Sequence, residues 1–358
     1  MPLLFSMYLD LVRFAAALAV FLDHLSTEPF SRGVVGGGLG QYGEIAVTVF
    51  FLLSGYVIAH VVATREGSAA AYFSSRAARL YSVVLVALLL TFVLDRIGLA
   101  VNPDFYATSK VLAKPVSWQG YLSSLLFLNE YQVFGFNGIA PGTNGPYWSL
   151  SFEASYYLIA GLMLFSRRAI GLPLVALLLA LAGKTIAVLL PVWALGFVLY
   201  RAQERCRMAA GLAWPALLCS GVALLAVPFL YKFDSGAFWF PYGRGPFNRD
   251  VLQDYEVAVI FALHLLAARS AFFEEGGQYS LQKPVRWLGA LTFPLYCMHY
   301  PVISLAAAIS PWRRSSLAHV AFECAVTALL VVAVTPLCDV LKAQMRVTLL
   351  RLPWWRRS

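Results

Sequence analysis

The sequence predicts an all-α fold, a polytopic integral membrane bundle of about ten transmembrane helices. Hydrophobic residues make up 60% of the 358 positions and charged residues only 13%, with a mean hydropathy of +0.71. A soluble domain is about half apolar and a quarter charged. The apolar runs reach the roughly 20 residues that a helix needs to cross a bilayer. They do not alternate with polar residues, which favours helices over a barrel.

The apolar runs place the expected spans in order along the chain. They lie near residues 8–25, 42–63, 77–98, 147–166, 169–184, 186–201, 210–230, 251–270, 286–309 and 317–341. The fifth and sixth are short enough to form one bent hairpin instead. A further apolar segment, residues 121–136, is interrupted by Asn129 and Glu130. We expect that segment to be re-entrant or interfacial.

The distribution of basic residues predicts the orientation of the chain. Ten spans place both termini on one side of the membrane. The loops on that side carry 16 of the 27 Lys and Arg residues, against ten on the other side. Because loops rich in Lys and Arg face the cytoplasm, we expect both termini there. Residues 1–345 form the predicted transmembrane domain, and residues 346–358 form a basic cytoplasmic tail.

Charge and cysteine content argue against two other classes of protein. The net charge of +9 is spread over loops between apolar runs, so it does not indicate nucleic-acid binding. The five cysteines lie mostly within predicted spans and show no spacing typical of metal ligands. We expect neither a disulfide framework nor a metal site.

The first span carries polar residues that are unusual at membrane depth. Arg13 and His24 are eleven residues apart, about three helical turns, so their side chains fall on nearly the same face. An ionised side chain in a bilayer costs about 2.5–3.5 kcal/mol and normally faces a bundle interior or a wet cavity. The alternative is that Arg13 reaches back to the interface and His24 caps the other end of the helix.

The second and third spans add three charged candidates. Glu44 opens the second span and either orients His24 or Arg13 or faces the outer interface; Ser54 and Gly55 in the same span provide a small packing surface.

Arg76 and Arg79 are three residues apart on one helix face, at the expected cytoplasmic edge. Two guanidinium groups so placed can bind phosphates with paired hydrogen bonds. The alternative is ordinary positive-inside topology.

Two later segments place polar groups at the depth expected for His24. Trp148 and Glu153 lie in the first turns of the fourth span, and His299 lies late in the ninth, between two prolines. A proline-broken helix is tolerated at membrane depth where neighbours satisfy the freed backbone groups. Two histidines and two glutamates at similar depth favour a site over separate structural roles.

Together these segments resemble the membrane-bound acyltransferase-3 family, which O-acylates cell-surface and secreted carbohydrates. The resembling motifs, in order, are Arg13 with His24, GEIAVTVFFLLSGYVI, RAARLY, YWSLSFEASYYL and FPLYCMHYPV. The resemblance covers most of the chain and is closest to the stand-alone membrane form. It implies a multi-pass protein of a bacterial inner membrane that acts on a surface or secreted glycan, lipid-linked glycans included.

The resemblance also implies an acyl-CoA donor, most often acetyl-CoA. It implies that Arg76 and Arg79 hold the nucleotide end of the donor, on the side where CoA is made. The pantetheine arm then passes Arg13, a candidate for both donor binding and catalysis, and presents the thioester near His24.

On this basis we hypothesise that His24 is the general base for the acceptor hydroxyl, since imidazole takes and returns a proton near neutral pH. Glu153, a candidate catalytic residue, or Glu44 would orient the ring. His299 would donate a hydrogen bond to the thioester oxyanion or contact the acceptor. His299, Glu44 and Trp148 are the candidate substrate-binding residues.

Three alternatives stay open at this point. His24 could become acylated in a two-step reaction, which predicts ping-pong kinetics instead of a ternary complex. A proton-coupled transporter or flippase could use the same intramembrane residues as a proton or substrate path. A structural or sensor membrane protein would tolerate alanine at all the candidate positions.

Overall fold

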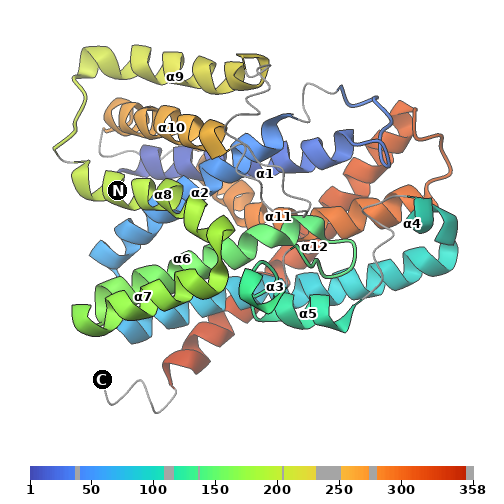
Figure 1. Ribbon diagram of the computed structural model, residues 1–358. Coiled ribbons are helices and arrows are strands. Elements are labelled where there is room, and N and C mark those ends of the chain that lie inside the picture. Colours follow the sequence, from blue (N-terminus) through green and yellow to red (C-terminus); the bar gives the residue numbers. More distant parts are fainter. Residues whose placement is uncertain are drawn as a thin grey trace. The chain divides into compact units, whose positions relative to one another are not determined.

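The computed structural model describes residues 1–36, 41–108, 117–135, 138–203, 205–230, 251–273 and 280–351, and the secondary structure of these residues is helical throughout (Figure 1). The longer helices are α1 (Leu3–Ser26), α2 (Tyr42–Thr64), α3 (Ala69–Val101), α6 (Trp148–Phe165), α7 (Arg168–Ala182), α8 (Lys184–Ala202), α9 (Ala210–Leu230), α10 (Val251–Ala271), α11 (Gln282–Ile309) and α12 (Leu317–Leu350). The short ones are α4 (Pro103–Thr108), α5 (Trp118–Leu125), η2 (Gln132–Phe134) and η3 (Gly145–Tyr147). Each of the ten predicted spans corresponds to one of the longer helices.

Within the described residues, eight helices are long and apolar enough to cross a membrane: α1, α2, α3, α8, α9, α10, α11 and α12. Helix α7 is apolar but has only 15 residues. The prediction of an all-α, multi-pass membrane protein is therefore confirmed. The count of ten spans and the cytoplasmic position of both termini stay predictions.

Helices α3 and α12 are the longest, with 33 and 34 residues. At 1.5 Å per residue each is about 50 Å long, well beyond the roughly 30 Å hydrocarbon core. Both begin at a serine cap, in which Ser68 Oγ accepts from Ala71 N and Ser316 Oγ accepts from His319 N, each at 3.2 Å. Because α12 continues to Leu350, residues 346–350 of the predicted tail are helical, while residues 352–358 lie outside the described part of the chain.

The chain divides into two compact units. Unit 1 comprises Met1–Val20, Gln41–Val61 and Val188–Thr292, and unit 2 comprises Phe21–Gly40, Val62–Ala187 and Phe293–Ser358. Helices α1, α2, α8 and α11 contribute residues to both units.

In unit 1, α2 and α8 approach each other closely at two glycines. A Cβ atom at Gly55 would collide with the backbone of Trp193, and one at Gly196 would collide with the backbone of Leu52. Trp193 Nε1 also donates to Ser54 Oγ at 3.2 Å. The interpretation of Ser54 and Gly55 as packing residues is confirmed. In the same unit α9 lies alongside α10 (Figure 1).

In unit 2, α12 packs along α3 and α6 packs against α7. The segment before α6 is held by a buried acid: Asp95 of α3 accepts from Thr143 N at 2.9 Å and from Thr143 Oγ1 at 2.7 Å. In the predicted re-entrant segment, Asn129 and Glu130 are 1% exposed, and Ser151 Oγ donates to Asn129 Oδ1. This non-helical backbone is therefore enclosed by protein.

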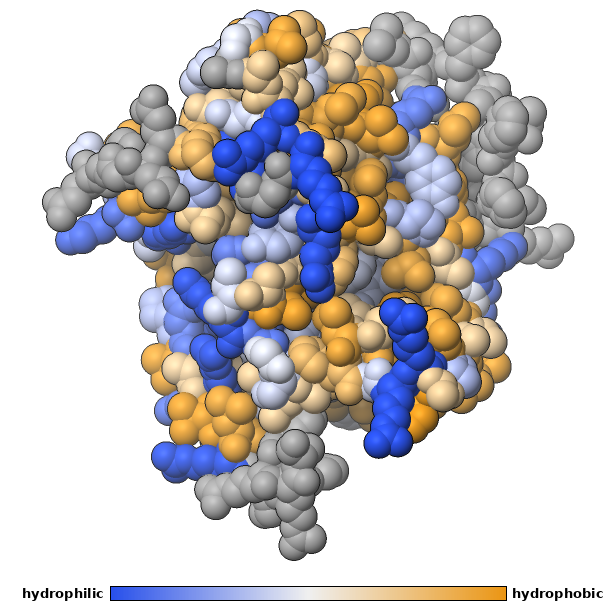
Figure 2. All heavy atoms as spheres, turned by 90° about the vertical axis from the view of Figure 1, so that its left-hand side faces the viewer, coloured by the Kyte–Doolittle hydropathy of each residue, from blue (hydrophilic) through white to orange (hydrophobic). Residues whose placement is uncertain are grey.

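The surface of the described residues is rich in large apolar side chains, as expected where helices face lipid. Leu89, Leu218 and Leu329 are 64%, 65% and 71% exposed. Figure 2 shows one face on which apolar side chains lie between several strongly hydrophilic ones.

Candidate active site

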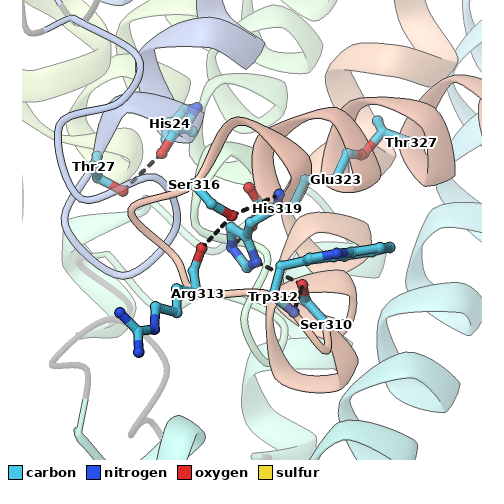
Figure 3. A network of polar contacts seen from close by, with 9 residues as sticks. All are labelled: His24, Thr27, Ser310, Trp312, Arg313, Ser316, His319, Glu323 and Thr327. Atoms are coloured by element: carbon cyan, nitrogen blue, oxygen red, sulfur yellow. Dashed lines mark hydrogen bonds and ion pairs between the residues drawn. The ribbon is translucent and has the colours of Figure 1, made fainter.

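His24 lies in the last turn of α1 and its side chain is half-buried in unit 2. The helix ends two residues later, at Ser26. Thr27 accounts for this local stop, because its Oγ1 donates to the His24 carbonyl oxygen at 2.7 Å and its amide donates to the same oxygen at 3.1 Å (Figure 3). The backbone of His24 is thus fixed at a helix end and its ring projects from there.

His299 lies within α11 and is fully buried. Two prolines of that helix lie nearby, and each removes the amide that would bond to the carbonyl four residues earlier. Pro301 thereby releases the carbonyl oxygen of Cys297. Asn144, also fully buried, donates to that oxygen through Nδ2 at 2.9 Å. The segment before α6 thus compensates for the break in α11 beside His299.

The structure brings His24 and His299 into direct contact. Nε2 of His299 lies 3.1 Å from Nδ1 of His24, and the ring centroids are 5.1 Å apart. Nδ1 of His299 faces the carbonyl oxygens of Leu295 and Tyr296, at 2.9 and 3.0 Å. The sequence had grouped the two histidines by depth without predicting this contact.

The neighbours of the two rings determine their tautomers. Carbonyl oxygens only accept, so Nδ1 of His299 carries a hydrogen, and Nε2 of the neutral ring is an acceptor. Nδ1 of His24 is then the donor in the contact between the rings. It follows that Nε2 of His24 carries the lone pair, which is the requirement for a base at that atom.

Aromatic side chains surround this histidine pair. The ring of Tyr300 meets His24 edge-on at 5.2 Å, and Phe21 meets His299 edge-on at 6.1 Å. Phe30, fully buried, packs against Tyr300 at 5.5 Å. Edge-to-face contacts of this kind fix the plane of a ring as well as its position.

The start of α6 packs beside the same part of α11. Ser149 Oγ lies 2.7 Å from the hydroxyl of Tyr296, and that hydroxyl also donates to the Pro146 carbonyl at 3.3 Å. Trp148 is half-buried and stacks edge-on against Phe152 at 5.0 Å. Trp148 therefore belongs to the same unit as the histidine pair, and its predicted contact with substrate stays a prediction.

Glu153 lies beside the arginine pair of α3. Its Oε1 accepts a short hydrogen bond from the hydroxyl of Tyr157, and both groups lie within electrostatic range of Arg79. The hypothesis that Glu153 orients His24 stays a prediction. The structure gives Glu153 a hydrogen bond from Tyr157 and places it within electrostatic range of Arg79 and Cys297.

Arg76 is paired inside the protein. Its Nη2 lies 2.8 and 3.1 Å from the two carboxylate oxygens of Glu66, and the two residues are 7% and 2% exposed. The rings of Tyr72 and Tyr157 flank the guanidinium at 5.7 and 5.6 Å. Sequence reasoning missed Glu66, which lies two residues before the serine cap of α3, ten residues before Arg76.

Two further basic residues join this region from α12. Lys342 lies within electrostatic range of Arg76, Arg79 and Arg346, with Asp339 as the nearby acid. Lys342 and Arg346 are both exposed. Their spacing of four residues placed them on one helix face, but no hydropathy pattern could show that this face meets α3. We call these four residues, Arg76, Arg79, Lys342 and Arg346, the basic cluster.

Arg13 and Glu44 belong to unit 1, Arg13 half-buried in α1 and Glu44 exposed in the first turn of α2. Their predicted roles, as donor-binding and substrate-binding residues, stay predictions. Among the residues that the structure describes, no three His, Cys, Asp or Glu side chains gather as they would around a metal ion.

Comparison with known proteins bears on the chemistry of this site. A family model described as an acyltransferase domain matches residues 7–340. The chain is also similar to acyltransferase MdmB of Streptomyces mycarofaciens, with 33% identity over 151 residues, which is 41% of this chain. The matched stretch spans 36% of that relative's length. No solved structure matches the chain.

Proposed function

Because the chain belongs to the acyltransferase-3 family, as its match over residues 7–340 shows, we propose that it moves an acyl group from acyl-CoA to a carbohydrate hydroxyl. Acetyl is the expected group, by resemblance to the family. The acceptor is a surface or secreted glycan at the extracytoplasmic side of a bacterial inner membrane. The observation that carries the proposal is the contact between His24 and His299, in which Nδ1 of His299 is fixed by the carbonyl oxygens of Leu295 and Tyr296.

In the proposed reaction, Nε2 of His24 removes the proton of the acceptor hydroxyl as its oxygen attacks the thioester carbonyl carbon. The carbon–sulfur bond breaks, and the leaving thiolate takes the proton back from His24. Acyl ester and free thiol are the products, so protons and electron pairs balance. General-base catalysis of this kind contributes about 10²- to 10⁴-fold in rate.

His299 supports this cycle without touching the proton that moves. When His24 becomes an imidazolium, its Nδ1–H donates to the Nε2 lone pair of His299, and a hydrogen bond to a charged donor is stronger than one between neutral groups. The contact therefore stabilises the charged state of His24 and holds the tautomer that the base requires. A hydrogen bond from His299 to the thioester oxyanion would need a hydrogen on Nε2; that role and a contact with the acceptor stay predictions.

The basic cluster supports the choice of donor. CoA carries a pyrophosphate and a 3′-phosphate, and four cations on two packed helices suit several phosphate groups. The carboxylates of Glu66 and Asp339 lie beside the cluster and balance part of its positive charge. The buried Nε atoms of Arg76 and Arg79 have no hydrogen-bond partner among the described residues.

The test is mass spectrometry of surface and secreted glycans from cells that carry the wild-type gene, no gene, or His24→Ala. We expect an acylated glycan only with the wild-type gene, and its mass identifies the acyl group. His60→Ala is the matched control, since His60 contacts Tyr200 in unit 1. Full acylation by His24→Ala would contradict the proposed base, whereas no acylated glycan with any gene would contradict the proposed acceptor.

A further inference from the structure

A second histidine pairs with a carboxylate at the start of α12, and none of the sequence motifs includes it (Figure 3). His319 and Glu323 are four residues apart, one helical turn, and both are fully buried. His319 Nε2 lies 3.2 Å from Glu323 Oε1. Ionisable residues inside a membrane bundle usually have a functional reason to be there.

Stability alone does not explain this pair. Burying polar groups costs free energy unless hydrogen bonds satisfy them, and apolar residues of similar volume often stabilise as well or better. Within the described part of the chain, neither His319 Nε2 nor either carboxylate oxygen of Glu323 has a partner with hydrogen-bond geometry. The contacts of His319 therefore indicate what the pair does.

His319 fixes the connection between α11 and α12. Its Nδ1 lies 2.7 Å from Ser310 Oγ, and its amide is capped by Ser316, whose Oγ donates to the Arg313 carbonyl at 2.7 Å (Figure 3). The neighbouring Arg314 packs over the ring of Phe105 at 4.5 Å. Burial lowers the pKa of Arg314, Arg32 adds to this effect, and Glu28 and Glu323 oppose it.

His319 also connects to the histidine pair. The backbone of Phe30 lies beside the His319 ring. The Phe30 ring packs on Tyr300 at 5.5 Å, and Tyr300 packs on His24 at 5.2 Å. The Phe30 amide donates to the carbonyl of Thr27, the first residue after α1, whose hydroxyl donates to the His24 carbonyl. A continuous set of contacts in unit 2 thus runs from Glu323 to the ring of His24.

We propose that His319 and Glu323 are positioning residues that hold the His24 ring through Phe30 and Tyr300. Glu323 orients the His319 ring, which anchors the turn after α1. The anchored turn holds Phe30 in contact with Tyr300, and the contact of Tyr300 with His24 fixes the plane of the His24 imidazole. This inference rests on the proposed function of His24. A displacement of about 1 Å at a reacting group can lower a rate about a hundredfold.

The first test compares Glu323→Gln, the double variant H319L/E323L and the control Thr335→Val, each purified as the full chain. Thr335 is a buried residue of α12 whose hydroxyl, among the described residues, bonds to the Val331 carbonyl of its own helix. We expect kcat to fall roughly 10- to 100-fold in the first two variants, with KM for acyl-CoA unchanged, and no change in Thr335→Val. The double apolar variant restores packing, so a merely structural role would restore its kcat as well.

The second test needs no turnover. The chain has only five histidines, so ¹⁵N-histidine NMR resolves the His24 and His299 signals once each is assigned by substitution. We expect both to shift or broaden in Glu323→Gln and to stay unchanged in Thr335→Val. Wild-type kcat together with unshifted signals in Glu323→Gln and H319L/E323L overturns the positioning role. If the wild-type protein transfers no acyl group, the proposed function fails, and the NMR comparison still decides the positioning role.

Discussion

At the scale of single residues, the chemistry depends on which nitrogen of each histidine carries a hydrogen. The arginine and histidine spacing of the first span singled out His24, and the proline-flanked motif singled out His299. The sequence could not show that the two rings touch, because the contact joins positions 275 residues apart and depends on packing. The tautomers follow only from the carbonyls around His299.

We predict that both rings are Nδ1–H tautomers in the resting protein, as ¹⁵N chemical shifts will report.

His299→Ala removes the hydrogen bond that His299 accepts from the charged His24. Such a bond is worth about 1.5–3 kcal/mol, so we expect kcat to fall roughly 10- to 150-fold. His264→Ala is the control, since His264 bonds to Tyr8 and Ser220 in unit 1. An Nε2–H tautomer at His299 would exclude the proposed support of His24.

At the scale of elements, hydropathy located each helix but not its full length. The third span was expected over residues 77–98, whereas α3 runs from Ala69 to Val101. The additional residues lie beyond the apolar stretch, so hydropathy does not register them, and the serine cap at Ser68 sets the true start. Helix α12 likewise extends past residue 341, the expected end of the tenth span, to Leu350. This extension carries Lys342 and Arg346, so the sequence indicated only Arg76 and Arg79 of the basic cluster.

The break in α11 yields a prediction about Asn144. Asn144→Ala leaves the Cys297 carbonyl buried without its donor, which costs about 1–3 kcal/mol of stability. Pro301→Ala restores a backbone amide that can bond to the same carbonyl. The double variant should therefore lose less thermal stability than the sum of the two single variants, measured as Tm in detergent. Simple additivity would show that Asn144 does not compensate for the proline.

The basic cluster yields a prediction about the donor. In the wild-type protein, acetyl-CoA should have a lower KM than acetyl-dephospho-CoA, which lacks the 3′-phosphate. Lys342→Ala should raise KM for acetyl-CoA and reduce the difference between the two donors, with kcat little changed, because it removes binding shared by ground and transition states. Arg168→Ala, another exposed basic residue of unit 2, should leave both KM values unchanged. An undiminished donor difference in Lys342→Ala would remove that residue from the phosphate site.

At the scale of the whole molecule, the sequence predicted the class, an all-α multi-pass membrane protein, but not the division into two units. Hydropathy is a local property, whereas the units are defined by contacts between distant segments, and four helices contribute to both. Unit 2 contains His24, His299, Glu153 and the basic cluster. The sequence placed these groups by depth alone, so it could not separate them from Arg13 and Glu44 in unit 1.

The predicted orientation of the chain decides on which side of the membrane the donor and the acceptor would bind. If loops rich in Lys and Arg face the cytoplasm, the loop before α3 is cytoplasmic and the loop before α12 is extracytoplasmic. Two exposed positions test this, Gly67 and Ser315; at Gly67 a Cβ atom would meet nothing within 4 Å. In a chain whose five natural cysteines are replaced, Ser315→Cys should react with an impermeant maleimide on intact spheroplasts, and Gly67→Cys only after permeabilisation. The reverse pattern would place the basic cluster outside, where acyl-CoA is absent, and would contradict the proposed donor.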